Sequence, residues 1–218
     1  MTPLQNALLK TLLYYDLWRH PLTRLEASSF LPLDPMTFAE FERRLDAAGP
    51  GEALGEERGY LFVRRDGDSP VEPRMLKEAH ASAMWRRARI AAGVLKRCPF
   101  VRGVMISGDL SKNATSTRSD VDFVVVTEPG RLWIARALLT AFKKLVLLNN
   151  KKYFCINYFV TTAALGQHER NVFVATEVAH TKPVVNSSLY RSYLEANAWV
   201  RLFFPNFAAA NLFQPPVD

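Results

Sequence analysis

Apolar side chains recur at helical spacing in the first fifth of the chain. Residues 6–18 place them at positions 8, 9, 12, 13 and 17, which lie on one face of a helix. Thr23, with Glu26 three residues later, is a capping-box pattern that opens a second helix. Residues 36–47 predict a third helix with phenylalanine and leucine on one face. Three short helices are therefore expected.

A β-hairpin is predicted next, over residues 53–63, with its turn between Glu56 and Gly59. Three helices followed by a two-stranded ribbon are typical of a winged helix. Residues 1–66 are therefore expected to form a winged-helix-like module. The polar stretch 64–73, which contains glycine and proline, predicts a linker or domain edge.

The remaining chain alternates between helical and β patterns. The expected elements are a helix at 74–97, strands at 101–106 and 121–127, a helix at 131–148, a strand at 153–161, and helices at 171–180 and 188–204. Their order predicts an α+β domain over 74–218, in which a mixed sheet is flanked by helices. The apolar neighbours of Trp85, Trp133 and Trp199 favour core positions for these side chains.

Composition narrows the cellular setting. No apolar run reaches the length of a membrane span, and the first ten residues lack the pattern of a secretory signal. The two cysteines, Cys98 and Cys155, lie far apart without a CxxC or Cys/His cluster, which indicates reduced thiols and no zinc site. We expect a cytoplasmic protein with no membrane partner. The net charge of +7 is compatible with a triphosphate or nucleic acid but proves neither.

The segment 106–127 carries the candidate chemistry. It predicts a strand, a turn, a polar loop, and a second strand that begins with Asp120-Val121-Asp122. Two aspartates at i and i+2 of a strand point to the same face, where their charges repel each other unless a cation lies between them. Mg²⁺ prefers one or two carboxylates completed by water and phosphate oxygens, so Asp120 and Asp122 are the candidate metal ligands, with Mn²⁺ as the alternative ion.

The turn before this strand offers groups suited to phosphate. Ser107 and Gly108 would present a hydroxyl and backbone N–H groups, and Ser111 adds a hydroxyl. Lys112 is suited to polyphosphate, although it could equally be a solvated loop residue. Asp109 could contact a metal or cap the turn through backbone N–H groups.

These residues resemble the signature of the nucleotidyltransferase superfamily that includes DNA polymerase β and the aminoglycoside nucleotidyltransferases. That signature is Gly-Ser, about ten residues, and Asp-x-Asp entering an apolar strand. Here Gly108-Asp109 is followed by the ten residues Leu110–Ser119 and then by Asp120. The resemblance covers residues 85–165 and implies a polymerase β palm-like fold. Bacterial members with a winged-helix-like start look closest, and because their chains continue further, a C-terminal truncation is expected.

Two departures from the family pattern put activity in question. Asp109 stands where the family has serine. The strand that would carry a third acid offers Asn157, which has no charge and cannot take a proton. Asn157 is either the third position of the site or a buried amide that satisfies its own hydrogen bonds. Glu177 is the candidate for a third acid supplied from outside this strand. Alternatively, it is a surface or capping residue of its helix.

The leading hypothesis is a Mg²⁺-dependent transfer of a nucleoside monophosphate from an NTP to an unknown acceptor, with release of pyrophosphate. The alternative is a catalytically degenerate regulator that binds nucleotide or DNA, including an antitoxin-like role. A recognition helix should be basic, and residues 36–47 carry three acids against two arginines. Specific DNA binding is therefore not expected, and the oligomeric state is open.

Overall fold

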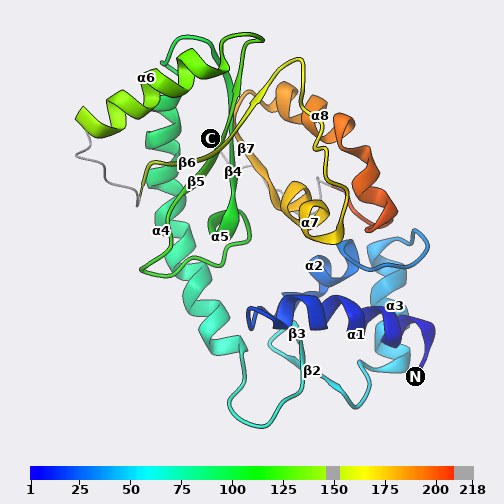
Figure 1. The fold of residues 1–218 in the computed structure, drawn as a ribbon. Coiled ribbons are helices and arrows are strands. Elements are labelled where there is room, and N and C mark those ends of the chain that lie inside the picture. Colours follow the sequence, from blue (N-terminus) through cyan, green and yellow to red (C-terminus); the bar gives the residue numbers. More distant parts are fainter. Residues whose placement is uncertain (146–152, 209–218) are drawn as a thin grey trace. The chain divides into compact units, whose positions relative to one another are not determined.

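A computed structural model describes residues 1–145 and 153–208, in which helices and strands are interspersed (Figure 1). The elements are α1 (Pro3–Asp16), β1 (Leu22–Thr23), α2 (Arg24–Ser29), α3 (Phe38–Ala48), β2 (Leu54–Glu57), β3 (Tyr60–Val63), α4 (Val71–Leu95), β4 (Val101–Ser107), α5 (Gly108–Ser111), β5 (Asp122–Thr127), α6 (Leu132–Leu145), β6 (Cys155–Thr161), α7 (Val172–His180), β7 (Lys182–Val185), α8 (Ser187–Ala196) and the 3₁₀ helix η1 (Ala198–Leu202). The chain is thus an α+β protein, as expected. Among the described residues, no helix combines the length and apolarity needed to cross a bilayer.

The chain divides into two compact units. Among the described residues, the first contains Met1–Leu76 and residues 199–208, and the second contains residues 77–145 and 153–198. The sequence placed residues 199–208 in the second domain, whereas they pack within the first unit. Phe204 meets Phe30 edge to face at 5.2 Å between ring centroids, and the Asn206 amide donates to the backbone oxygen of Leu31 at 3.1 Å.

Capping residues define the helices of the first unit. Thr23 and Glu26 form the predicted capping box at the start of α2. A second capping box, between Thr2 and Gln5, starts α1 earlier than the apolar pattern indicated. The predicted hairpin is confirmed as β2 and β3, and the short β1 adds a third strand in the order β1-β3-β2. The three expected helices are all present.

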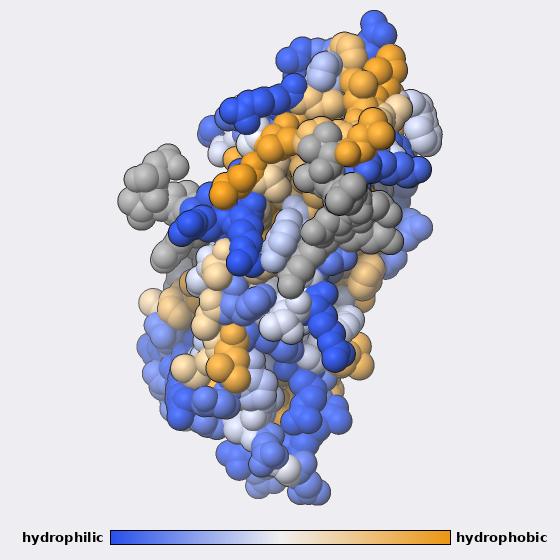
Figure 2. Space-filling view, turned by 90° about the vertical axis from the view of Figure 1, so that its left-hand side faces the viewer, coloured by the Kyte–Doolittle hydropathy of each residue, from blue (hydrophilic) through white to orange (hydrophobic). Residues whose placement is uncertain are grey.

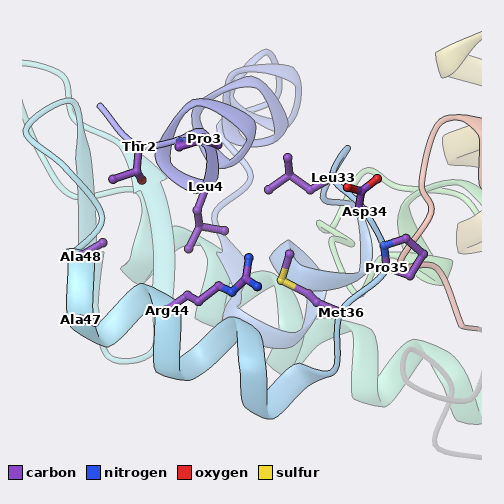
Figure 3. Close-up of a pocket in the computed structure, with 10 residues that line it drawn as sticks. All are labelled: Thr2, Pro3, Leu4, Leu33, Asp34, Pro35, Met36, Arg44, Ala47 and Ala48. Carbon is purple, nitrogen blue, oxygen red and sulfur yellow. The ribbon is translucent and has the colours of Figure 1, made fainter.

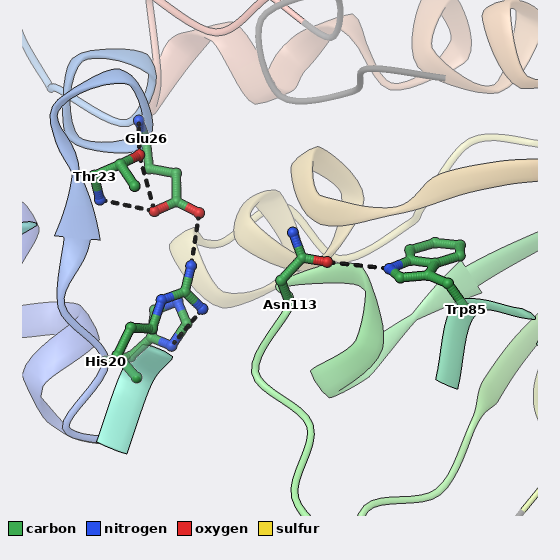
Figure 4. Close-up of polar contacts among 6 residues, drawn as sticks. His20, Thr23, Glu26, Trp85 and Asn113 are labelled. Atoms are coloured by element: carbon green, nitrogen blue, oxygen red, sulfur yellow. Dashed lines mark hydrogen bonds and ion pairs between the residues drawn. The ribbon is translucent and has the colours of Figure 1, made fainter. Parts of the chain in front are cut away.

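A buried charged group ties the start of α4 to α2. The Arg74 side chain is 1% exposed, and its guanidinium pairs with Glu26 Oε1 at 3.1 Å. The other carboxylate oxygen of Glu26 accepts from the backbone N–H of Thr23 at 2.8 Å, and His20 lies beside this pair (Figure 4). One carboxylate therefore caps α2 and also compensates a buried cation, which would be costly if left alone.

A four-stranded mixed sheet forms the centre of the second unit, in the order β6-β5-β4-β7. β5 runs antiparallel to β4 and parallel to β6. The three predicted strands are confirmed as β4, β5 and β6. β7 was not anticipated, because its four residues (KPVV) are too short and too near a proline to give a strand pattern.

Helices cover both faces of this sheet (Figure 1). Apolar residues of α4 and α6 share a core with one face of β4 and β5, and this core includes Met84, Ala88, Leu95, Leu139, Ile106, Phe123 and Val125. α7 and α8 contact β4 from the other side.

Two local predictions for this region are wrong. Trp133 was expected in the core but is 74% exposed, because the α6 face that meets the sheet carries Ala135 and Leu139. The helix expected over 188–204 is interrupted: α8 ends at Ala196, and a 3₁₀ helix follows. Asn197 ends it because its buried amide bonds the backbone oxygen of Leu165. Trp199 is buried, as predicted.

Candidate functional site

Asp120 and Asp122 lie at the start of β5, where this strand meets the end of β4. Asp122 is the first residue of β5 and is paired with Ser107, the last residue of β4. Val121 between them is fully buried in the core, whereas both aspartates are only partly buried. The buried valine thus fixes the strand while its two neighbours point away from the core.

Gly108 allows the chain to turn directly beside the Asp122 carboxylate. Its φ of 66° lies in the left-handed region that favours glycine. A Cβ atom at this position would stand 2.4 Å from Asp122 Oδ2, which is far inside van der Waals contact. The absence of a side chain at Gly108 is therefore required by the position of this carboxylate.

Several carboxylates surround this point. Partial burial is the main cause that raises the pKa of Asp122, and the charges of Asp120, Asp109 and Glu177 raise it further. A hydrogen bond from the Cys155 thiol acts in the opposite direction. These carboxylates thus lie close enough to repel one another. The start of β5 therefore carries several negative charges in a partly buried setting.

Asp109 closes the loop between the two strands. Its Oδ2 accepts from the Ser119 hydroxyl at 2.7 Å, and its backbone oxygen accepts from Ala114 N at 2.9 Å. The carboxylate therefore bonds a side-chain hydroxyl of the residue that immediately precedes Asp120. Sequence reasoning missed Ser119, since a serine in a serine-rich loop gives no signal of its own. The Asp109–Ser119 bond fixes the approach of the chain to the aspartate pair.

The first part of this loop is held by Trp85. Its indole N–H donates to Asn113 Oδ1 at 3.1 Å (Figure 4). Asn113 has a positive φ of 51°, a conformation that asparagine tolerates better than most residues. Trp85, which is partly buried against the core, thus also makes a polar contact that fixes the turn after α5.

Lys112 and Glu177 form an ion pair that joins α5 to α7. Both side chains are partly exposed, at 21% and 32%. Glu177 therefore lies near the aspartates, as its effect on the pKa of Asp122 also shows. The Ser111 hydroxyl donates to the backbone oxygen of Gly108 at 2.8 Å and so stabilises the turn. The structure brings all the residues predicted between Ser107 and Asp122 to one end of the sheet.

The residue beside Asp122 on the next strand is Cys155. The register pairs Asp122 with Cys155 and Phe123 with Ile156, and then passes over one residue to pair Val124 with Tyr158. Asn157 is that extra residue, and it is exposed. The interpretation of Asn157 as a buried amide is therefore wrong. The Cys155 thiol, which sequence reasoning missed, donates to the Asp122 carboxylate, and burial together with that negative charge raises its pKa.

Asp120 and Asp122 are the side chains that could hold a divalent ion. Within residues 1–145 and 153–208, no group of three or more His, Cys, Asp or Glu side chains is placed to ligate a metal. A pair of carboxylates is sufficient for Mg²⁺ when phosphate oxygens and water complete its coordination. Besides burial, the charges of neighbouring acids raise the pKa of Asp122, and a bound cation would relieve this repulsion.

Comparisons of the chain with protein-family models, with curated proteins and with solved structures gave no match. Any functional assignment therefore depends on the residues of the strand end.

A separate hollow lies within the first unit. It has a volume of about 540 Å³ and lies between the start of α1, the segment before α3, and α3 itself (Figure 3). Its wall is mainly apolar, and the Arg44 guanidinium at its edge is paired with Glu40. None of the residues around the aspartates lines it, so it adds nothing to their chemistry.

Proposed function

We propose that the second unit is a nucleotidyltransferase domain that moves a nucleoside monophosphate from an NTP to an acceptor and releases pyrophosphate. The observation that carries the proposal is the Asp120-Val121-Asp122 strand end, held against the glycine turn at Gly108. The mixed sheet that bears it, with helices on both faces, supports a polymerase β palm-like fold.

In this proposal Asp120 and Asp122 hold Mg²⁺, and Mn²⁺ can take its place. When bound, the ion orients the triphosphate and offsets the negative charge that develops on the transferred phosphoryl group. Ser107 and the backbone at Gly108 contact the phosphates. Lys112 reaches them when its pair with Glu177 opens, and Glu177 is then a further acid close to the aspartates.

The remaining polar side chains act on the loop rather than on the nucleotide. Asp109 accepts a hydrogen bond from Ser119 and so orients the chain that leads into Asp120, while its charge adds to those that a bound cation would offset. Ser111 bonds the backbone of Gly108 and preserves the turn. This division of roles accounts for an aspartate where the family has serine.

The alternative is a regulator that binds nucleotide without turnover. Cys155 favours it, because a thiol with a raised pKa stands where a third carboxylate would lie beside Asp122. A neutral thiol cannot take the proton of an attacking hydroxyl as a carboxylate can. Binding and transfer must therefore be measured separately.

We further propose that the first unit is a winged-helix-like module used for packing or protein contact. Its three helices and three-stranded sheet support this assignment. Both arginines of α3, Arg43 and Arg44, are paired with Glu40. These cations are partly neutralised, which is unfavourable for binding the phosphates of DNA.

The test is calorimetric titration of each of the four NTPs, with and without Mg²⁺, beside a pyrophosphate-release assay. We expect binding to need the divalent ion, and Asp122→Asn to weaken it at least tenfold, or about 1.4 kcal/mol. Glu195→Gln removes an exposed acid of α8 in the same unit and serves as the matched control. Metal-independent binding that survives Asp122→Asn would contradict the proposal, and binding without pyrophosphate release would select the regulator.

A further inference from the structure

α6 carries a wide apolar face, and the described residues of its own unit bury only one edge of it. The inner face is formed by Ala135 and Leu139, which are buried, and by Phe142, which packs on Phe154 at 5.8 Å between ring centroids. The apolar positions continue around α6 from this inner face to an adjoining outer one, and Arg136, Thr140 and Lys143 form the polar side of the helix.

The outer face is a continuous apolar stripe. Ile134, Leu138 and Leu145 are 43%, 44% and 80% exposed, and Ala141, between the last two, is exposed as well. Their spacing of four, three and four residues is that of a and d positions in a coiled coil. Figure 2 shows apolar side chains gathered on the part of the surface where α6 lies.

This spacing indicates which kind of surface would cover the stripe. Four residues at a/d spacing form a seam that fits between the side chains of one facing helix. The exposed Ala137 and Ala141 are small and let a facing backbone come close. Single exposed apolar residues are common on proteins, but an ordered stripe of this kind marks an interaction site.

The charges beside the stripe indicate which charge the partner should carry. Lys144 borders the stripe beside Ala141, whereas Arg136 and Lys143 lie on the polar side of the helix, and α6 has no aspartate or glutamate. Arg131, which precedes it, lies one turn before Ile134 and is also exposed. Two copies of this helix would bring like charges together, whereas a helix with acidic residues beside its apolar seam would form ion pairs.

We propose that the outer face of α6 (Ile134, Leu138, Ala141 and Leu145) binds an amphipathic helix of a partner protein that carries acidic residues beside its apolar seam. The apolar stripe supplies the buried area, and Arg131 and Lys144 select the charge of the partner. The inference is independent of nucleotide chemistry, because none of these residues belongs to the strand end at Asp122.

The test uses a fluorescent synthetic peptide of three heptads with Leu at a and d and Glu at e and g, titrated with the full chain and followed by anisotropy. A matched peptide has Lys in place of Glu. We expect the acidic peptide to bind at least tenfold more tightly than the basic one and to weaken as salt is raised. Leu138→Ser combined with Leu145→Ser should reduce its binding at least tenfold.

Ile90→Ser is the matched control, since Ile90 is 66% exposed on α4 and lies outside the stripe. It should leave binding unchanged, and circular dichroism melts should show all variants folded. No binding up to about 1 mM, or equal binding of both peptides, would overturn the proposal. Sedimentation that shows a dimer abolished by Leu138→Ser would assign the face to a second copy instead. Cosedimentation with phosphatidylserine vesicles, lost in the same variant, would assign it to a lipid surface.

Discussion

Replacing Gly108 with alanine tests the link between the turn and the Asp122 carboxylate. The new Cβ would stand 2.4 Å from Asp122 Oδ2, and real Cβ contacts are not shorter than 3.0 Å. Because the turn at Gly108 continues directly from β4, the carboxylate is the part that must move. A displacement on the order of 1 Å at a reacting centre can cost about 10²-fold in rate.

The backbone contributes a separate cost that a second glycine can measure. Gly130 has a φ of 71°, close to the 66° of Gly108, but a Cβ there would meet no atom within 4 Å. Gly130→Ala therefore carries the left-handed strain alone, about 1–2 kcal/mol. The difference between the two variants isolates the contact with Asp122.

The assays are urea unfolding and calorimetric titration of NTP with Mg²⁺. We expect both variants to lose about 1–2 kcal/mol in the free energy of unfolding, and only Gly108→Ala to lose tenfold or more in nucleotide affinity. Wild-type affinity in Gly108→Ala would refute the placement of Asp122 in the site. An equal loss of affinity in Gly130→Ala would show that the effect is general strain.

Three further predictions follow from particular contacts. Cys155→Asp should tighten Mg²⁺ binding and give a Mg²⁺-dependent rise in melting temperature. Asn157→Asp, at an exposed position, should change neither quantity. The reverse result would return Asn157 to the site. Burial raises the pKa of Tyr193 to about 12. The neutral phenol therefore contributes fully to the free energy of unfolding below about pH 10, and this contribution is lost as the pH rises toward 12. Urea unfolding between pH 8 and 12 should show this loss in the wild type and a shallower one in Tyr193→Phe, and identical slopes would exclude it. Because the arginines of α3 are paired with Glu40, duplex DNA should bind no more tightly than about 10⁻⁴–10⁻⁶ M, and a nanomolar footprint would contradict this.

Patterns of local origin could be read from the sequence. The capping box at Thr23 and the β-branched run that became β5 depend on neighbouring residues, and both are present as predicted. The glycine turn at Gly108 and the aspartate pair that follows it could also be located, because the two have a recognisable spacing. Local chemistry thus located the candidate site.

Features that depend on pairing between distant segments could not be read. Which edge of the wide apolar face of α6 turns inward is set by its fit to the sheet, so Ala135 and Leu139 are buried while Ile134 and Leu138 are exposed. A wide apolar face gives no sharp phase that would distinguish the buried edge from the exposed one. The ion pair between Lys112 and Glu177 likewise joins residues 65 positions apart.

The third position of the site shows this limit most clearly. Counting along an alternating strand gives Cys155 and Asn157 the same face, and asparagine is the better mimic of an acid, so the sequence favours Asn157. The extra residue between the pairs Phe123–Ile156 and Val124–Tyr158 breaks that alternation. Cys155 consequently remains beside Asp122, while Asn157 is left exposed at the irregularity. A register shift of one residue thus decides whether the neighbour of the aspartate pair is an amide or a thiol. It also makes residue 155 the position at which a carboxylate would complete the site.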